Sequence, residues 1–246
     1  EMSASLVGSE MCIRDSLCIV SSVSLACFAY AGLLKLGEIL FGISVQHEAG
    51  YICAMLFIIP GFPFITSGID LAKLDMRSGI ERLTYALIVI LVATMSAWIM
   101  ALILHLKPVD FIKLSLSTEQ WILFRLLASF CGVFGFSIMF NSPVRLAVAA
   151  AGIGAVANTL RLELVDLANI PPAAAAFIGA LTAGLLASLL KNKVGYPRIS
   201  VTVPSIVIMV PGLYLYRGFY NLGIMSLSVA ASWFASAILI LSLIHI

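Results

Sequence analysis

Hydrophobic residues along this chain gather into eight long runs that short polar stretches separate. Each run holds about the number of residues, roughly 20, that an α-helix needs to cross a hydrocarbon core about 30 Å thick. Apolar and polar residues do not alternate in segments of about ten, as they would in an outer-membrane barrel. The pattern therefore predicts an all-α, polytopic membrane helical bundle of about eight spans. The expected spans are residues 17–34, 50–65, 83–105, 121–140, 144–160, 172–190, 201–216 and 222–243.

Composition supports the same class of protein. Hydrophobic residues make up 62% of the chain and charged residues 11%, whereas about a quarter of the residues of a soluble domain are charged. The formal net charge is +2, and no cluster of basic residues follows a line suited to a phosphate backbone, which excludes nucleic-acid binding. The five cysteines form no CxxC pair, so the sequence predicts no metal site and no disulfide framework. It also predicts no cofactor.

The two ends of the chain differ from the rest. Residues 1–16 are polar and have no helical period, and the chain stops inside an apolar segment. We interpret residues 1–16 as a non-native flank and residues 244–246 as a non-native tail. The chain is then expected to be a fragment that lacks its native N-terminal part.

Prolines interrupt two of the expected spans. The second span contains Ile59-Pro60-Gly61-Phe62-Pro63, and the seventh contains Val203-Pro204-Ser205 and Val210-Pro211-Gly212. Proline lacks the amide hydrogen and clashes with the carbonyl four residues back, so we expect each of these helices to break or kink. Broken backbone at membrane depth must line a cavity or be buried in protein.

The two interruptions resemble each other, which indicates a weak internal repeat. Ile-Ile-Pro-Gly-Phe and Met-Val-Pro-Gly-Leu are each followed, seven or eight positions after the proline, by a glycine and then by another apolar span. Paired broken helices in two halves of a chain are typical of a transporter with a central binding site. The alternative interpretation is that these prolines only bend the helices for packing.

Charged residues near the spans are candidates for function, because a charge at the bilayer centre costs several kcal/mol. Arg125 lies four residues into its span, and we expect it to snorkel to the headgroups. Arg145 follows a polar helix start that includes Asn141; it is either an interfacial anchor or a substrate contact. Asp70 lies close to the first break and is either part of a solvated connecting helix over residues 66–82 or a proton or cation group.

Two further groups of polar residues adjoin the spans. Near the end of the fifth span, Asn158 and Arg161 share one helix face while Thr159 and Glu163 share another. One face is suited to line a pathway and the other to pair with a neighbouring helix, and local ion pairing alone explains them equally well. Tyr214 follows the second break, where interfacial anchoring and substrate contact are both open.

Enzyme motifs are missing from the sequence. It contains no G-x-S-x-G elbow, no H-E-x-x-H, no P-loop and no G-x-G-x-x-G after a strand. No convergent nucleophile and base can be named, so we expect the protein not to be an enzyme.

Three long segments resemble the bacterial threonine/serine exporter family. They are PGFPFITSGIDLAKLDMRSGIERL (60–83), FNSPVRLAVAAAGIGAVANTLRLELVDL (140–167) and GYPRISVTVPSIVIMVPGLYLYRG (195–218). The resemblance extends over about residues 21–237. It implies an inner-membrane protein of about ten helices in two related parts, with residues 17–118 holding the later helices of the first part and residues 119–243 forming the second part.

The resemblance implies proton-coupled export of threonine and serine through a multi-pass protein of the bacterial inner membrane. A related two-chain branch is associated with dicarboxylate export, so a succinate-like solute is the first alternative. A non-transporting membrane scaffold for another subunit is the second. The expected partners are the amino-acid substrate and the lipid bilayer, and a homo-oligomer is compatible with the sequence.

We hypothesise that half-helix ends at the two breaks face a cavity, where dipole ends and an arginine bind a substrate carboxylate. Backbone carbonyls and an acid would bind the ammonium group, and a partly desolvated carboxylate would exchange the coupling proton. The expected substrate-binding residues are Pro60, Gly61, Asn141, Arg145, Asn158, Arg161, Ser205, Pro211, Gly212 and Tyr214, and the expected proton-coupling residues are Asp70 and Glu163.

Overall fold

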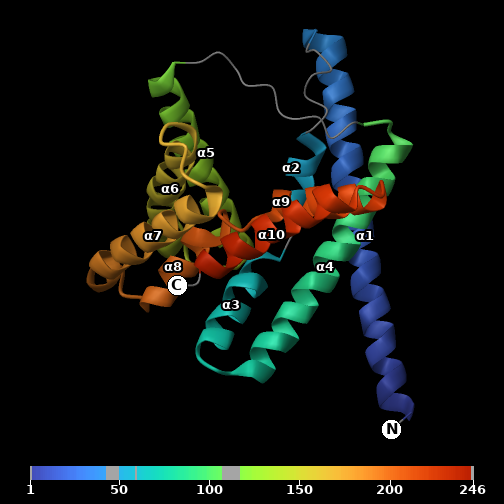
Figure 1. The fold of residues 1–246 in the computed structure, drawn as a ribbon, viewed down its shortest axis with the longest axis horizontal. Coiled ribbons are helices and arrows are strands. Elements are labelled where there is room, and N and C mark those ends of the chain that lie inside the picture. The colour runs from blue at the N-terminus through green and yellow to red at the C-terminus, as the bar shows by residue number, and fades with distance from the viewer. Residues whose placement is uncertain (1, 43–49, 59, 107–116, 245–246) are drawn as a thin grey trace. The chain divides into compact units, whose positions relative to one another are not determined.

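The computed structural model describes residues 2–42, 50–58, 60–106 and 117–244, and the regular structure in these ranges is helical (Figure 1). The first helices are α1 (Met2–Phe41), α2 (Gly50–Leu56), α3 (Gly61–Ala72), α4 (Met76–Ile103) and α5 (Thr118–Met139). They are followed by α6 (Val144–Asp166), α7 (Pro172–Val194), α8 (Arg198–Val207), α9 (Gly212–Gly223) and α10 (Leu227–Ile244). The predicted all-α class is confirmed.

Five helices of the described residues are long and apolar enough to cross a membrane, and the number rises to seven when each broken pair counts as one span. The five are α1 from Asp15 onward, α4, α5, α6 and α7, and the pairs are α2 with α3 and α8 with α9. The apolar part of α10, Leu227–Ser242, is shorter. These elements correspond in order to the eight expected spans, although the number that crosses the bilayer is only approximate.

The two broken pairs are built alike. In each pair a short helix ends, a break of at most four residues follows, and a helix of 12 residues begins at the glycine of a Pro-Gly step. These glycines are Gly61 in α3 and Gly212 in α9. Both predicted breaks are therefore confirmed, at Pro60 and at Pro211.

Pro204 does not break its helix, whereas Pro211 does. Pro204 lies inside α8, which continues to Val207. Proline removes the bond to the carbonyl four residues back, which here belongs to Ser200 in the half-buried first turn of the short helix. The freed carbonyl thus lies near the start of the helix and not in its middle, so the helix tolerates the proline.

The prediction of a connecting helix over residues 66–82 was wrong. Helix α3 continues to Ala72, and a tight turn leads directly into α4 at Met76. In this turn Leu74 has φ 63, and the amide of Asp75 donates to the carbonyl of Asp70 at 3.0 Å. The charged residues therefore lie on the ends of two longer helices. Helix α1 also runs back to Met2, through residues whose sequence has no helical period.

The chain forms two compact units. The first consists of Glu1–Pro60, Thr84–Leu114 and Leu215–Ala231, and the second of Gly61–Leu83, Ser115–Tyr214 and Ser232–Ile246. Within the second unit α6 packs against α5, α7 and α8, and Figure 1 shows α5, α6 and α7 side by side. Helix α6 therefore forms the centre of that unit.

Small residues bring these helices close together. A Cβ atom on Gly154 of α6 would lie 2.9 Å from the carbonyl oxygen of Ser205 in α8 and 2.7 Å from a methyl group of Val133 in α5. On α7, a Cβ atom on Gly179 would lie 3.1 Å from the carbonyl oxygen of Ala157. These small residues therefore allow close packing of α6 against its neighbours.

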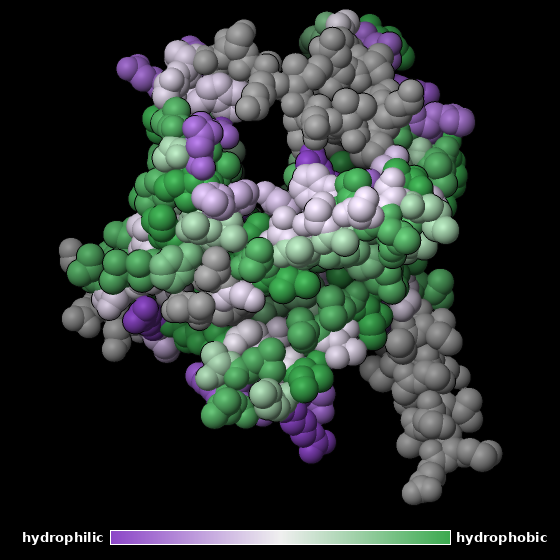
Figure 2. Space-filling view, viewed as in Figure 1, coloured by the Kyte–Doolittle hydropathy of each residue, from purple (hydrophilic) through white to green (hydrophobic). Residues whose placement is uncertain are grey.

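The outer surface of the second unit is hydrophobic. Figure 2 shows hydrophobic residues over most of the visible part of α7, and large apolar side chains of this helix, among them Leu181, Leu185 and Leu189, are exposed. A soluble protein does not expose a continuous apolar surface of this kind. This apolar surface is suited to contact with the hydrocarbon chains of lipid.

Replacing Gly154 by alanine should lower stability by about 1–3 kcal/mol, because overpacking forces neighbouring backbone apart. Gly152→Ala is the matched control, since nothing lies within 4 Å of the Cβ position there. We expect Gly152→Ala to leave the midpoint of thermal unfolding in detergent unchanged or slightly higher. Equal midpoints for the two variants would contradict the close contact of α6 with α8.

Candidate functional site

The start of α3 packs against the end of α8 within the second unit. A Cβ atom on Gly61 would lie 3.3 Å from a methyl group of Val207 and 3.5 Å from one of Val210. Val210 directly precedes Pro211 and Gly212, which are both buried. The beginning of α3 and the second break are therefore neighbours. Protein atoms cover the backbone there, as a break at membrane depth requires.

Arg161 lies beside the same break. A Cβ atom on Gly179 of α7 would be 3.2 Å from Cβ of Arg161 and 3.3 Å from the sulfur of Met209, so α6, α7 and the break meet at this point. The structure thus brings Arg161 and the second break together, and Tyr214 lies on the other side of the break in the first turn of α9.

The guanidinium group of Arg161 is incompletely paired. Its Nε atom is buried and has no hydrogen-bond partner among the described residues. None of the ion pairs among the described residues includes Arg161. Burying a charge without a partner is costly, so this nitrogen indicates a place for an anion or for water.

Two neighbours of Arg161 on α6 are also incompletely paired. The side-chain amide of Asn158 donates to the hydroxyl of Ser129 in α5 at 2.8 Å, but its Oδ1 atom is buried and has no partner in the described structure. The same holds for the hydroxyl of Thr159. Within one turn, α6 therefore carries one free cationic donor and two free acceptors.

Arg125 binds two carboxylates on the neighbouring helix. Its guanidinium donates to Glu163 at 2.8 Å and also pairs with Asp166, and it lies over the ring of Trp121 at 5.2 Å. The side chain is only 18% exposed. Arg125 is therefore paired within the protein, because two acids on the last turns of α6 lie within its reach.

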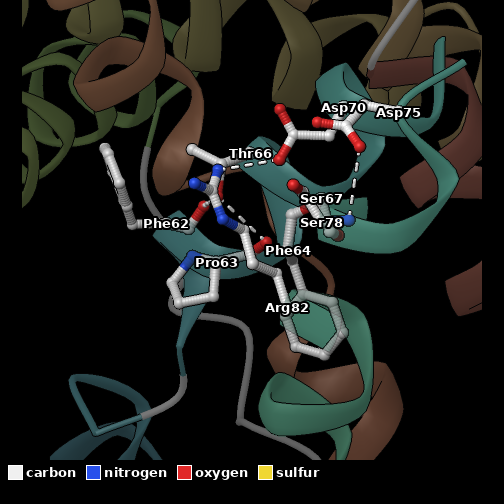
Figure 3. Close-up of polar contacts among 9 residues, drawn as sticks. All are labelled: Phe62, Pro63, Phe64, Thr66, Ser67, Asp70, Asp75, Ser78 and Arg82. Atoms are coloured by element: carbon white, nitrogen blue, oxygen red, sulfur yellow. Dashed lines mark hydrogen bonds and ion pairs between the residues drawn. The ribbon is translucent and has the colours of Figure 1, made fainter. Parts of the chain in front are cut away.

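Asp70 is also ion-paired. Its carboxylate lies 2.8 Å from the guanidinium of Arg82, across the turn between α3 and α4. Figure 3 shows the side chain of Arg82 beside Thr66 with the guanidinium group directed toward Asp70. One acid and one arginine form this pair, so their charges cancel, although the contact of the buried Oδ2 atom of Asp70 with Arg82 is an ion contact and not a well-directed hydrogen bond.

The other expected site residues have different surroundings. The hydroxyl of Ser205 lies 3.0 Å from the carbonyl of Ala150 and 2.7 Å from that of Val201, so it joins α8 to α6. The ring of Tyr214 contacts Trp233 edge to face. Arg145 is exposed. Ser205 therefore has a packing role, and Arg145 does not join the group around Arg161.

A cavity of about 540 Å³ adjoins α3 and α8 in the second unit. Phe62 and Thr66 of α3, Asn141 after α5, and Ser200 and Pro204 of α8 contribute to its wall. Small-molecule sites commonly measure about 300–1,000 Å³. The cavity is large enough for an amino acid and collects hydroxyl and amide groups, so Asn141 lies where a solute has room.

Sequence reasoning missed a pair of tyrosines in the first unit. Tyr51 of α2 and Tyr216 of α9 are almost fully buried, and their hydroxyls lie 2.7 Å apart. They join the first half of one broken span to the second half of the other. A polar atom inside an otherwise apolar span was the available signal, but the pairing of two tyrosines 165 positions apart was not predictable from it.

Comparison with protein families identifies the family of the chain. A family profile described as "Threonine/Serine exporter, ThrE" matches residues 125–246, and a second profile with a threonine/serine exporter description matches residues 4–104. The chain belongs to the threonine/serine exporter family. No curated protein and no solved structure matches it.

Membership of the threonine/serine exporter family makes this chain a multi-pass membrane protein of a transporter class, with a small-molecule substrate. Among the residues that the structure describes, no group of three or more His, Cys, Asp or Glu side chains is placed to hold a metal ion. The polar group on α6 beside the second break is the candidate site of this family member.

Proposed function

We propose that this protein exports threonine and serine from the cytoplasm across the bacterial inner membrane, driven by the proton gradient. Family membership supports the transporter class and the kind of solute. The observation that carries the proposal is the buried, unpartnered guanidinium nitrogen of Arg161 beside the second break.

In this proposal Arg161 binds the substrate carboxylate. A guanidinium group binds a carboxylate through two parallel hydrogen bonds, and such charge-assisted bonds are the strong ones. The free acceptors of Asn158 and Thr159 lie on the same turn of α6. They are suited to accept hydrogen bonds from the substrate ammonium and hydroxyl groups. Threonine and serine carry all three of these groups.

The helix ends at the breaks contribute to the same site. Helices α3 and α9 begin at Gly61 and Gly212, and the unpaired amides at a helix N-terminus attract negative charge. In our proposal Pro60 and Pro211 end the preceding helices, so that the positive dipole ends of α3 and α9 lie beside the site without touching the solute.

Glu163 is the proposed proton-coupling residue. Glu163 and Asp166 share the single guanidinium of Arg125, which leaves one negative charge in excess on a partly buried cluster. Asp70 has its own arginine, Arg82, so its charge is already balanced. The arrangement thus favours Glu163 over Asp70.

A dicarboxylate fits the arginines less well. Arg145 and Arg161 are both on α6, 16 positions apart, which corresponds to about 24 Å at 1.5 Å per residue. The two carboxylates of a succinate-like solute are only a few ångströms apart, so one molecule cannot contact both arginines. The geometry therefore favours a solute with a single carboxylate.

Arg161→Gln should abolish threonine and serine export at low substrate concentration. Losing one partner of a desolvated charge pair costs about 2–5 kcal/mol, so the substrate concentration for half-maximal flux should rise by about 30-fold or more. Arg161→Lys should keep part of the activity because it keeps the charge. The measurement is efflux of labelled threonine and serine from vesicles, with succinate as comparison solute.

Arg77→Gln is the control for this experiment, because Arg77 is 91% exposed and pairs only with exposed Glu81. Its flux should equal that of the wild type. Normal flux through the Arg161→Gln protein would contradict the assignment of Arg161. Release of succinate instead of the amino acids would contradict the proposed substrate.

Glu163→Gln should uncouple transport from the proton gradient. The variant removes the exchangeable proton but keeps a side chain of the same shape beside Arg125. We expect it to exchange labelled for unlabelled threonine at equal concentrations while losing the stimulation of efflux by an imposed pH gradient. Glu81→Gln, in an exposed pair, should keep the stimulation. Loss of stimulation in Asp70→Asn alone would assign the proton to Asp70 instead.

A further inference from the structure

A long groove in the second unit lies apart from the polar group on α6. It has a volume of about 370 Å³ and is formed by α3, α7, α8 and Ile244 at the end of α10. Its lining is apolar except for Arg198 and Thr202, and the aliphatic side chains include Ile65, Leu181 and Leu185. An amino acid is too polar for this lining, so the groove is not a second site for the exported solute.

Arg198 is the polar group that remains available in the groove. The hydroxyl of Thr202 already donates to the carbonyl of Arg198 at 3.0 Å. The guanidinium of Arg198 extends over α7, since one of its nitrogens would lie 3.2 Å from a Cβ atom on Gly184. It takes part in none of the ion pairs in the described ranges. An apolar groove thus ends at one unneutralised cation.

The chain around Arg198 is basic. The segment from Lys191 to Arg198 contains three basic residues and no acidic one. Basic residues next to a membrane span attract anionic lipid headgroups, and basic pockets between membrane helices bind them specifically. The helix that lines the groove, α7, exposes 50% of Leu181 and 59% of Leu185. The acyl chains of membrane lipids therefore surround the groove.

We propose that this groove binds an anionic phospholipid, with an acyl chain lying along α7 and α8 and the headgroup phosphate on Arg198. The apolar length takes the hydrocarbon, and the guanidinium matches a phosphate with two parallel hydrogen bonds. The cavity beside Asn141 and a third cavity between α3 and α10 contain no charged residue in their walls. Of these three cavities, only the one with Arg198 distinguishes an anionic from a neutral lipid. The inference does not depend on the proposed transport function.

The test is retention of lipid by the purified full chain in detergent, measured by native mass spectrometry with phosphatidylglycerol and phosphatidylcholine of identical acyl chains. Basic residues near anionic lipid contribute about 1 kcal/mol each, which corresponds to about a five-fold preference. We expect the wild type to retain phosphatidylglycerol about five-fold over phosphatidylcholine, and Arg198→Gln to show no preference.

Arg145→Gln is the matched control. Arg145 is likewise an exposed arginine in the first turn of a helix that a proline precedes, with nearly the same proline dihedral angles, but it does not line the groove. The Arg145→Gln protein should prefer phosphatidylglycerol over phosphatidylcholine as strongly as the wild type does. An absent preference in the wild type, or equal losses in the two arginine variants, would overturn the proposal.

Gly184→Leu tests the groove without removing the charge. A leucine there fills the space under Arg198, and the only atom near its Cβ position is the movable end of that side chain. We expect the variant to lose bound phosphatidylglycerol and Gly184→Ala to keep it, with both proteins showing the helical circular dichroism of the wild type. Full retention by Gly184→Leu would also overturn the proposal.

Discussion

Lipid offers no hydrogen bonds, and this constraint governs every polar group in the structure. In the second unit most of these groups find partners in protein. The hydroxyl of Ser205 joins α8 to α6, the amide of Asn158 reaches Ser129, and Arg125 collects two carboxylates. Arg161 departs from this pattern, because its buried Nε atom has no hydrogen-bond partner among the described residues.

The architecture explains why this charge lies beside the second break. Helix α6 is the centre of the second unit, and its small residues let α5, α7 and α8 approach closely. Gly179 removes the side chain that would otherwise separate Arg161 from Met209. The second break begins beside Met209, so α8 ends where the arginine lies. A packing feature and a backbone interruption thus create one polar site together.

Local features of the sequence were sufficient for the elements of the fold. Span length and hydropathy act within about 20 residues, and a Pro-Gly step ends a helix by its own chemistry, so the breaks at Pro60 and Pro211 were predictable. Which of the two prolines of the seventh span breaks the helix depends on how far each lies from the helix start. The ion pairs were not predictable in the same way. Arg125 meets Glu163 only because of how α5 and α6 are rotated, and the same rotation brings the amide of Asn158 to Ser129.

The central claim is that Arg161 binds the carboxylate of an exported hydroxyl amino acid. It is tested most directly by competition against labelled threonine efflux in vesicles that contain the wild-type protein. Unlabelled threonine is compared with threonine amide, which keeps the ammonium and hydroxyl groups but has no carboxylate. The account predicts that threonine competes and that threonine amide, at the same concentration, does not. Equal competition by the two compounds would contradict it.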